Sequence, residues 1–173
     1  MKRNVEVWDY AGRILRVLGN GALLTTKADG KVNTMTIGWG TLGIEWGKPI
    51  FVAYVRESRY TRELLEKNPE FTVNIPFGEC DKGILGVCGT KSGRDMDKIE
   101  ALGLELEEGR TVSVPGIRQL PLTLECKVIY TQLQDESKIR REAAERYYPR
   151  NEAGKADNHF AFYGLITDAY IIE

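Results

Sequence analysis

The sequence has few of the residues on which the commoner kinds of catalytic and metal sites depend. It contains three cysteines, Cys80, Cys88 and Cys126, and a single histidine, His159. The cysteines are odd in number and lack CxxC spacing, which argues against a disulfide framework, a zinc site and a thioredoxin-type pair. One histidine without a Ser or Cys partner at a recognisable spacing defines neither a hydrolase triad nor a multi-histidine metal site. We therefore expect metal-free chemistry in a reducing cytoplasm.

Long apolar runs and an excess of one charge are also missing. No stretch approaches the roughly 20 apolar residues of a membrane span. The basic start MKRNVEVWDY has no apolar run after it, which argues against a secretory signal peptide. With 24 basic and 25 acidic residues, the chain has no broad field for nucleic acid or an anionic membrane. We expect one domain over residues 1–173, in which any phosphate must meet a local pocket.

The pattern of apolar residues predicts mainly β-strands with a few short helices. The expected strands are Leu23 to Lys27, Val32 to Gly40, Ile50 to Val55, Phe71 to Ile75, Leu124 to Leu133 and Phe160 to Ile172. The expected helices are Trp8 to Leu18 with Asp9 as N-cap, Thr61 to Asn68, two glycine-broken pieces between Glu79 and Leu102, and Asp135 to Tyr148. Six strands without a βαβ rhythm favour a β-barrel with helical insertions over a doubly wound sheet.

The junction between the strand ending at Val55 and the following helix is the sharpest local feature. Backbone N–H groups at a helix start carry partial positive charge, and Ser58, Arg59 and Thr61 add hydroxyl and guanidinium donors. Together these groups suit a phosphate monoester. The alternative makes Ser58 or Thr61 an ordinary N-cap and the arginine a solvated charge, and spacing alone favours that alternative.

Two further segments and the histidine have similar double interpretations. Gly38 and Gly40 let a planar ligand approach the strand backbone, or they accommodate a bulge while Trp39 fills the core. The segment from Cys88 to Lys98 is dense in donors but lacks the P-loop order, and Lys98 either faces a ligand or is an exposed helical lysine. For His159, orienting a strand end outweighs catalysis.

Five segments occur in one order along the chain: NTMTIGWGT, RESRYTRELLEKNPEFTVNIP, SGRDMDK, PLTLECKVI and HFAFYGLI. This ordered set resembles the flavin reductase-like FMN-binding split-barrel family, which includes flavin reductases, ferric reductases and flavoredoxin. The resemblance covers about residues 12–131 and 158–172. It implies a six-stranded split barrel that forms a homodimer and binds FMN near the subunit interface.

The resemblance also implies which residues hold the cofactor. Those expected to line the isoalloxazine are Asn33, Met35, Thr36, Gly38 and Trp39. Those expected around the phosphate and ribityl chain are Arg56, Ser58, Arg59, Tyr60 and Thr61. The polar side of the cofactor would be closed by Ser92, Gly93 and Lys98, and the open flavin face or the partner subunit would meet Tyr130, His159 and Phe162.

The implied function is an FMN-binding oxidoreductase, an NAD(P)H-dependent flavin reductase. NADH or NADPH would reduce bound FMN, with His159 placing the nicotinamide, and electrons would pass to a flavin, ferric or protein acceptor. A flavoredoxin-like electron carrier with little NAD(P)H activity is the alternative, and a flavin-free binding domain is the third interpretation. Residues 132–157 form a helical insertion relative to shorter family members, which acts either as a lid or as surface decoration.

Overall fold

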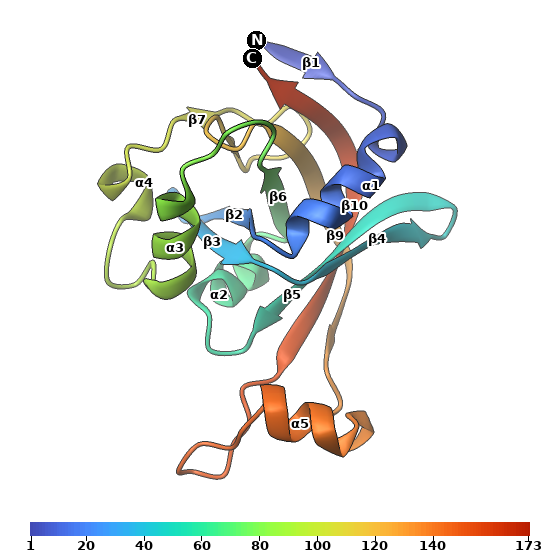
Figure 1. The fold of residues 1–173 in the computed structure, drawn as a ribbon, viewed down its shortest axis with the longest axis vertical. Coiled ribbons are helices and arrows are strands. Elements are labelled where there is room, and N and C mark those ends of the chain that lie inside the picture. The colour runs from blue at the N-terminus through green and yellow to red at the C-terminus, as the bar shows by residue number, and fades with distance from the viewer.

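The computed structural model describes all 173 residues as a mainly β fold around one open, barrel-like sheet (Figure 1). The strands are β1 (Lys2–Asn4), β2 (Ala22–Ala28), β3 (Lys31–Ile37), β4 (Gly40–Glu45), β5 (Lys48–Arg56), β6 (Glu70–Ile75), β9 (Leu122–Leu133) and β10 (His159–Ile172). Their order is β3-β2-β6-β9-β10-β5-β4, with β1 paired to β10. Because β3 and β4 end this path without pairing to each other, the barrel is split, which confirms the predicted fold class.

The sheet has eight strands rather than the six expected. The predicted strand Val32 to Gly40 ends at Ile37, and β4 begins at Gly40, so Gly38 and Trp39 lie between two strands. A tight hairpin joins β4 to β5, with positive φ at both Trp46 (49°) and Gly47 (71°). Two consecutive residues with positive φ are typical of a two-residue hairpin turn. The sequence prediction overlooked this pair because its signal is a strained tryptophan rather than Asn-Gly or Asp-Gly.

Most of the helices pack against strands of the sheet, and one projects away from it (Figure 1). They are α1 (Val7–Leu18), α2 (Tyr60–Lys67), α3 (Lys82–Thr90), α4 (Lys98–Ala101), a 3₁₀ helix η1 (Glu136–Lys138) and α5 (Arg141–Tyr147), and a small second sheet joins β7 (Leu106–Glu107) to β8 (Gly116–Ile117). None of the helices has the length and apolar character needed to cross a membrane.

Two helix predictions need correction. The N-cap of α1 is Glu6, which makes no side-chain capping bond, and Asp9 instead lies in the first turn. A carboxylate there still interacts favourably with the positive end of the helix dipole. The predicted helix from Asp135 to Tyr148 is two pieces, because extended backbone at Ile139 separates η1 from α5. Asp135 does cap η1, since its side chain accepts a bond from Ser137 N.

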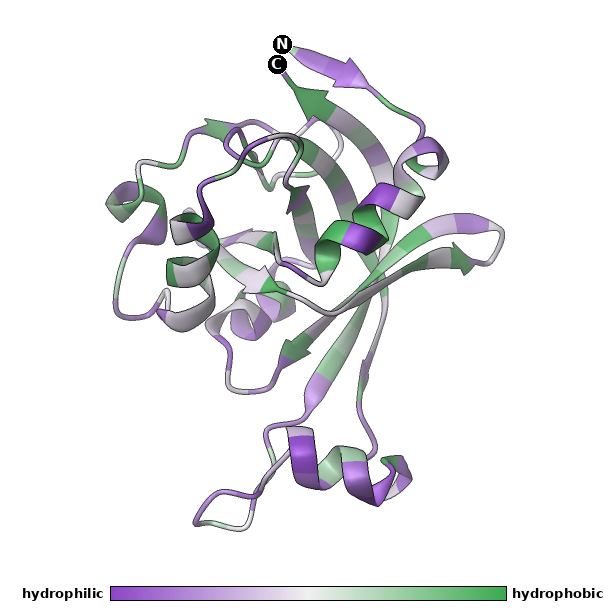
Figure 2. Ribbon diagram, viewed as in Figure 1, coloured by the Kyte–Doolittle hydropathy of each residue, from purple (hydrophilic) through white to green (hydrophobic).

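The main core lies inside the barrel and includes Ile14 of α1 together with Phe51 and Phe71 from facing strands. A smaller cluster under α3 includes Leu23, Ile84 and Cys88. By contrast, Figure 2 shows that hydrophilic residues predominate along α5 and its flanking loops, which project from the barrel at the far end of β9 and β10. The insertion therefore adds little to the core.

A buried carboxylate fixes the loop before β8 to the outside of β9. Glu125 is fully buried and accepts hydrogen bonds from Arg110 N (2.8 Å), Thr111 N (2.7 Å) and Thr111 Oγ1 (2.7 Å). Burial acts to raise the pKa of Glu125, but the bonds from Arg110 and Thr111 outweigh it and lower the pKa below the ordinary value. The group is therefore ionised in the folded protein at neutral pH.

Candidate functional site

A cationic cavity lies between β3, the start of α2 and the segment that joins α3 to α4. Its volume is about 100 Å³, and its lining includes the cationic side chains of Arg59, Lys91, Arg94 and Lys98 but no carboxylate. Arg94 is paired with Glu63 at 2.5 Å, whereas Arg59 and Lys91 take part in no ion pair. Unpaired cations around a concave surface are the donor set that a phosphate group needs.

Lys98 is the most buried of these cations, with 4% of the residue exposed. Its Nζ donates to the carbonyl oxygens of Lys91 (3.2 Å) and Cys88 (3.5 Å) and has no carboxylate partner. Burial lowers the pKa of Lys98. The nearby Cys88 acts to raise that pKa, and the charge of Arg59 lowers it further. Since a buried charge is costly without a counter-ion, an anion in the cavity would stabilise this arrangement. Of the two interpretations of Lys98, the exposed helical lysine is therefore wrong.

Close packing between Asn33 and Gly93 gives this cavity its shape. Asn33 Nδ2 donates to Thr61 Oγ1 at 3.1 Å, which ties β3 to the first turn of α2. A Cβ atom on Gly93 would lie 2.0 Å from Asn33 Oδ1, far inside any real contact. Lys31 holds the same segment through a bond from its Nζ to Gly93 O at 2.7 Å. Glycine at position 93 therefore has a packing reason that does not depend on a ligand.

The donors of Ser58 are engaged by an acidic residue of the insertion. Asp157 accepts from Ser58 N (3.0 Å) and from Ser58 Oγ (2.7 Å). Arg56 donates to Asp157 O (2.7 Å) and to Tyr147 O (3.0 Å). The donors before α2 thus bind an anion, as the sequence suggested, but that anion is the carboxylate of Asp157 in the same chain. Ser58 and Arg56 fasten the insertion to the barrel.

A second cavity of about 180 Å³ continues from the first along β3. The two share Met35 and Arg59, and the second is also lined by Thr36, Ile37, Gly38, Trp39, Tyr54, Arg56 and His159. His159 reaches it because the antiparallel register pairs His159 on β10 with Arg56 on β5. The backbone of β3, the α2 junction and the start of β10 are thereby brought to one surface.

All but two of the sequence-predicted site residues line one of these two cavities. The exceptions are Phe162, which is 3% exposed and packs in the main core, and Tyr130, which is exposed and lies against Tyr163 with ring centroids 5.1 Å apart. Neither of them meets the cavities within this chain. The roles assigned to the predicted residues in cofactor binding stay predictions.

Several lining residues were not predicted from the sequence. Tyr54 lines the second cavity and had a readable signal, because it precedes Arg56 by two positions on the same strand and so shares its face. Lys91 and Arg94 lie within a segment that was singled out for its donors, although neither was chosen. Asp157, which bonds Ser58 at the edge of the first cavity, and Tyr148, which bonds His159, come from the insertion, and no local pattern predicts where the insertion docks.

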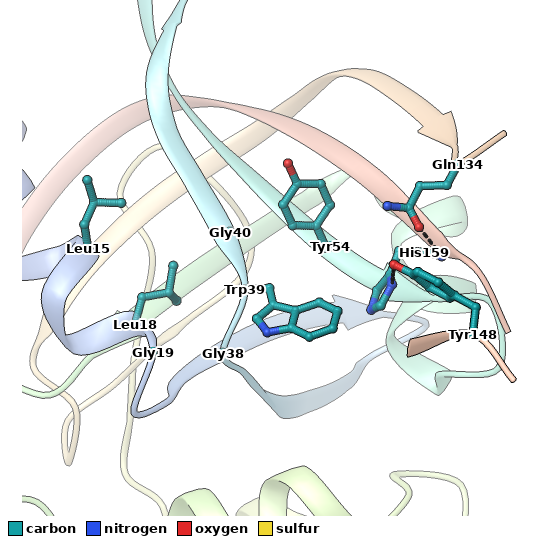
Figure 3. Close-up of a pocket in the computed structure, with 10 residues that line it drawn as sticks. All are labelled: Leu15, Leu18, Gly19, Gly38, Trp39, Gly40, Tyr54, Gln134, Tyr148 and His159. Atoms are coloured by element: carbon teal, nitrogen blue, oxygen red, sulfur yellow. Dashed lines mark hydrogen bonds between the residues drawn. The ribbon is translucent and has the colours of Figure 1, made fainter. Parts of the chain in front are cut away.

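A third cavity, of about 420 Å³, adjoins the second and contains no charged side chain (Figure 3). The two cavities share Gly38, Trp39, Tyr54 and His159, and the third adds Leu15, Leu18, Gly19, Gly40, Gln134 and Tyr148. The rings pack against one another: the centroid of His159 lies 5.3 Å from that of Trp39 and 5.5 Å from that of Tyr148. Tyr147 packs edge-on against Trp39 at 5.3 Å.

His159 is held as an uncharged ring at this junction. It is 6% exposed, and its Nδ1 shares a 2.9 Å hydrogen bond with the hydroxyl of Tyr148. Burial lowers the pKa of His159 to about 4, with the cations of Arg56 and Arg59 contributing and Asp157 opposing. At neutral pH the imidazole can therefore donate or accept a hydrogen bond, but it does not present a positive charge.

Comparison with known proteins shows which family the chain resembles. The flavin reductase like domain matches residues 16–173. An uncharacterized protein of Archaeoglobus fulgidus is 34% identical over 99 residues, covering 57% of this chain and 55% of its own length. The uncharacterized protein YddH of Escherichia coli is 31% identical over 127 residues, covering 70% of this chain and 66% of its own length. The chain thus spans between about half and two thirds of these relatives.

Solved structures agree with this match. Flavoredoxin from Methanosarcina acetivorans has a TM-score of 0.65 and 29% identity, over 88% of this chain and 68% of its own. An FMN-binding domain of a flavin reductases-like enzyme from Shewanella baltica has a TM-score of 0.66 over 99% of this chain and 77% of its own, and at 19% identity it supports the fold alone. The protein therefore belongs to the flavin reductase-like domain family.

Proposed function

We propose that this protein is an FMN-binding oxidoreductase that works as an NAD(P)H-dependent flavin reductase. NADH or NADPH supplies the electrons, which pass through FMN to a flavin, a ferric compound or a protein acceptor. The observation that carries the proposal is the charge of the first cavity, where Arg59 and Lys91 have no ion pair and Lys98 is buried without a carboxylate. Family membership and 29% identity to a flavoredoxin support a flavin-linked redox role.

The cavities match the two ends of FMN chemically. Arg59, Lys91 and Lys98 would hold the phosphate, and the backbone of β3 from Met35 to Trp39 would lie along the ring system. FMN supplies the redox chemistry when bound. The protein contributes position and electrostatics: Lys98 places positive charge near the cofactor, and the uncharged His159 offers a hydrogen bond for placing the nicotinamide.

Removing one unpaired cation of the first cavity, Arg59, tests whether the cavity holds the phosphate. Arg59→Ala should weaken FMN binding about ten- to a hundredfold, because charge-assisted bonds contribute about 1.5–3 kcal/mol each. Riboflavin lacks the phosphate, so its affinity should change little. Quenching of flavin fluorescence measures both. Lys67→Ala is the matched control, since Lys67 lies on α2 but pairs with Asp29 outside the cavity. Equal losses for FMN and riboflavin would refute the assignment.

A flavoredoxin-like electron carrier with little NAD(P)H activity is the second candidate, favoured by the similarity to the Methanosarcina acetivorans protein. Anaerobic mixing of the flavin-loaded protein with NADH and with NADPH separates the two. A reductase should bleach the flavin absorbance at about 1–1000 per second, whereas a carrier should bleach slowly or not at all. A colourless preparation that takes up no FMN would instead favour a flavin-free binding domain.

We also propose a cytoplasmic homodimer of single-domain chains, with no nucleic-acid or membrane partner. Large apolar side chains are exposed in the lining of the third cavity at Leu15 (49%) and Trp39 (46%) and on the β4–β5 hairpin at Ile44 (68%) and Trp46 (72%). Exposed apolar clusters of this kind mark contact surfaces. Light scattering during gel filtration should give twice the chain mass, and a mass of 19.5 kDa would contradict the dimer.

A further inference from the structure

The insertion places a carboxylate on donors that belong to the lining of the first cavity. Ser58 lines this cavity, and both of its donors are taken by Asp157: Ser58 N donates to Asp157 Oδ1 (3.0 Å) and Ser58 Oγ donates to Asp157 Oδ2 (2.7 Å). Arg56 bonds the backbone oxygen of Asp157 rather than its carboxylate. A carboxylate that accepts one bond on each oxygen occupies the positions that two oxygens of a phosphate group would take.

The position of Ser58 is fixed from its other side as well. Arg94 donates to Ser58 O at 3.2 Å, and the same guanidinium pairs with Glu63 on α2 at 2.5 Å. The backbone N–H and the hydroxyl of a serine each carry a single hydrogen, so each can be donated fully to only one acceptor. A phosphate group that bonds Ser58 must therefore displace the carboxylate of Asp157.

The charges of the cavity set the terms of this competition. Arg59, Lys91 and Lys98 attract an anion into the cavity, and they outnumber the one carboxylate at Ser58. That carboxylate repels the same anion. Two like charges about 4 Å apart repel by an amount equivalent to about fivefold in affinity even at the dielectric constant of water. The cations thus permit phosphate binding, and the carboxylate weakens it.

We propose that Asp157 competes with the phosphate of the ligand for Ser58 and thereby limits how tightly the first cavity holds a phosphate monoester. The ligand then exchanges with solution instead of staying permanently bound. The inference deepens the proposed function and rests on it for the identity of the monoester as FMN, which becomes an exchanging substrate of the reductase. The competition itself requires only a phosphate group.

Replacing the carboxylate tests the competition on the full-length protein. Asp157→Ala should bind FMN at least about fivefold more tightly than the wild type, measured by quenching of flavin fluorescence. The affinity for riboflavin, which lacks the phosphate, should change less than about twofold. Release of FMN on dilution should slow by about the same factor as its affinity rises, since affinity differences between variants lie mostly in the dissociation rate. The bond from Arg56 to the backbone oxygen of residue 157 is compatible with alanine.

Glu152→Ala is the matched control. Glu152 belongs to the same insertion, is exposed and lies outside the lining of the first cavity. Its replacement removes the same charge, so its FMN affinity should equal that of the wild type. Far-ultraviolet circular dichroism and thermal unfolding show whether each variant remains folded. Asp157→Asn, which keeps the size of the side chain and removes its charge, should still bind FMN about fivefold more tightly and serves if Asp157→Ala fails to fold.

A double-mutant cycle shows whether the effect runs through Ser58. In the wild type the phosphate exchanges one acceptor of Ser58 for another, so Ser58→Ala should change FMN affinity less than about twofold. In the Asp157→Ala background the hydroxyl is free to bond the phosphate, so Ser58→Ala should weaken FMN binding about fivefold, the factor for one net hydrogen bond. A simple long-range repulsion would give the same effect of Ser58→Ala in both backgrounds.

Every other outcome overturns the inference. Unchanged FMN affinity in Asp157→Ala and Asp157→Asn would remove the competition, and an equal gain for riboflavin would place the effect on the ring instead of the phosphate. An equal gain in Glu152→Ala would reduce it to net charge. FMN binding that is insensitive to Asp157 refutes this inference alone. If no variant binds FMN, the proposed function fails, and calorimetric titration with inorganic phosphate decides the inference: Asp157→Ala should bind it at least about fivefold more tightly than the wild type, and equal or absent binding would overturn the competition.

Discussion

The surroundings of His159 predict that the protein loses stability as the pH falls below neutral. His159 is the only histidine in the chain, it is 6% exposed, and its Nδ1 is hydrogen-bonded to Tyr148. Protonating the folded protein places a cation next to Arg56 and Arg59. The perturbation is a shift from pH 8 to pH 5, applied to the wild type and to His159→Gln, which has no titrating group at that position.

The direction and size follow from the two pKa values of the imidazole. The folded pKa is about 4, below the value of about 6.5 in the unfolded chain. As the pH falls, the unfolded chain therefore binds the proton first, so the stabilisation is complete above about pH 6.5 and is lost progressively toward pH 4. At pH 5 the linkage gives a loss of about 2 kcal/mol. Since the ring borders an open cavity, we lower the expectation to about 1–2 kcal/mol.

Urea unfolding at pH 8, 7, 6 and 5 measures this loss. The free energy of unfolding of the wild type should fall by about 1–2 kcal/mol more than that of His159→Gln over this range. Because the chain has one histidine, its imidazole resonance gives the pKa directly by proton NMR once any tag has been removed. Parallel pH profiles for the two proteins, or an imidazole titrating near 6.5, would refute the account of a buried neutral ring.

Three further changes probe other parts of the structure. Glu125→Gln should lower the free energy of unfolding at pH 7 by about 2–4 kcal/mol in urea; the difference should shrink below about pH 4.5, where the unfolded carboxylate is protonated first. Gly93→Ala should lower both the melting temperature and FMN affinity, because its Cβ would overlap Asn33 Oδ1, whereas Gly86→Ala meets open space on a helix and should be tolerated. Deleting residues 137–150 should alter acceptor preference while FMN stays bound, and an unaltered preference would make the insertion decorative.

Elements with local signals were predictable from the sequence. The hairpin between β2 and β3 has positive φ at Asp29 (51°) and Gly30 (75°), as its turn residues indicate. The apolar run in β5 became a strand buried on both faces over most of its length, and α2 ends just before Pro69. The β4 strand was missed because its turn uses Trp46, which the usual turn preferences disfavour.

The site was predictable only in part, and spacing alone was not enough. Taken by itself, the junction before α2 favoured an ordinary N-cap, and the resemblance to a family identified it as a place where several segments meet. Contacts distant in sequence supplied the rest: Asp157 bonds Ser58 across 99 positions, and Tyr148 reaches His159 only because the insertion folds back. Such contacts follow from the path of a 26-residue segment, 132–157, whose polar sequence does not specify where it docks.

The boundary between the cationic and uncharged cavities follows from the register of β5 and β10. Pairing His159 with Arg56 places the guanidinium among the carbonyl oxygens of Asp157 and Tyr147, so its charge is satisfied by the chain. His159 is buried next to this guanidinium, and its burial keeps the imidazole neutral at neutral pH. Unsatisfied positive charge is therefore confined to the side of Arg59, and the cavity on the side of Trp39 is lined by aromatic, aliphatic and uncharged polar groups. A ligand that spans this boundary must carry its anionic group at one end and an uncharged planar ring at the other, which is the polarity of a flavin mononucleotide.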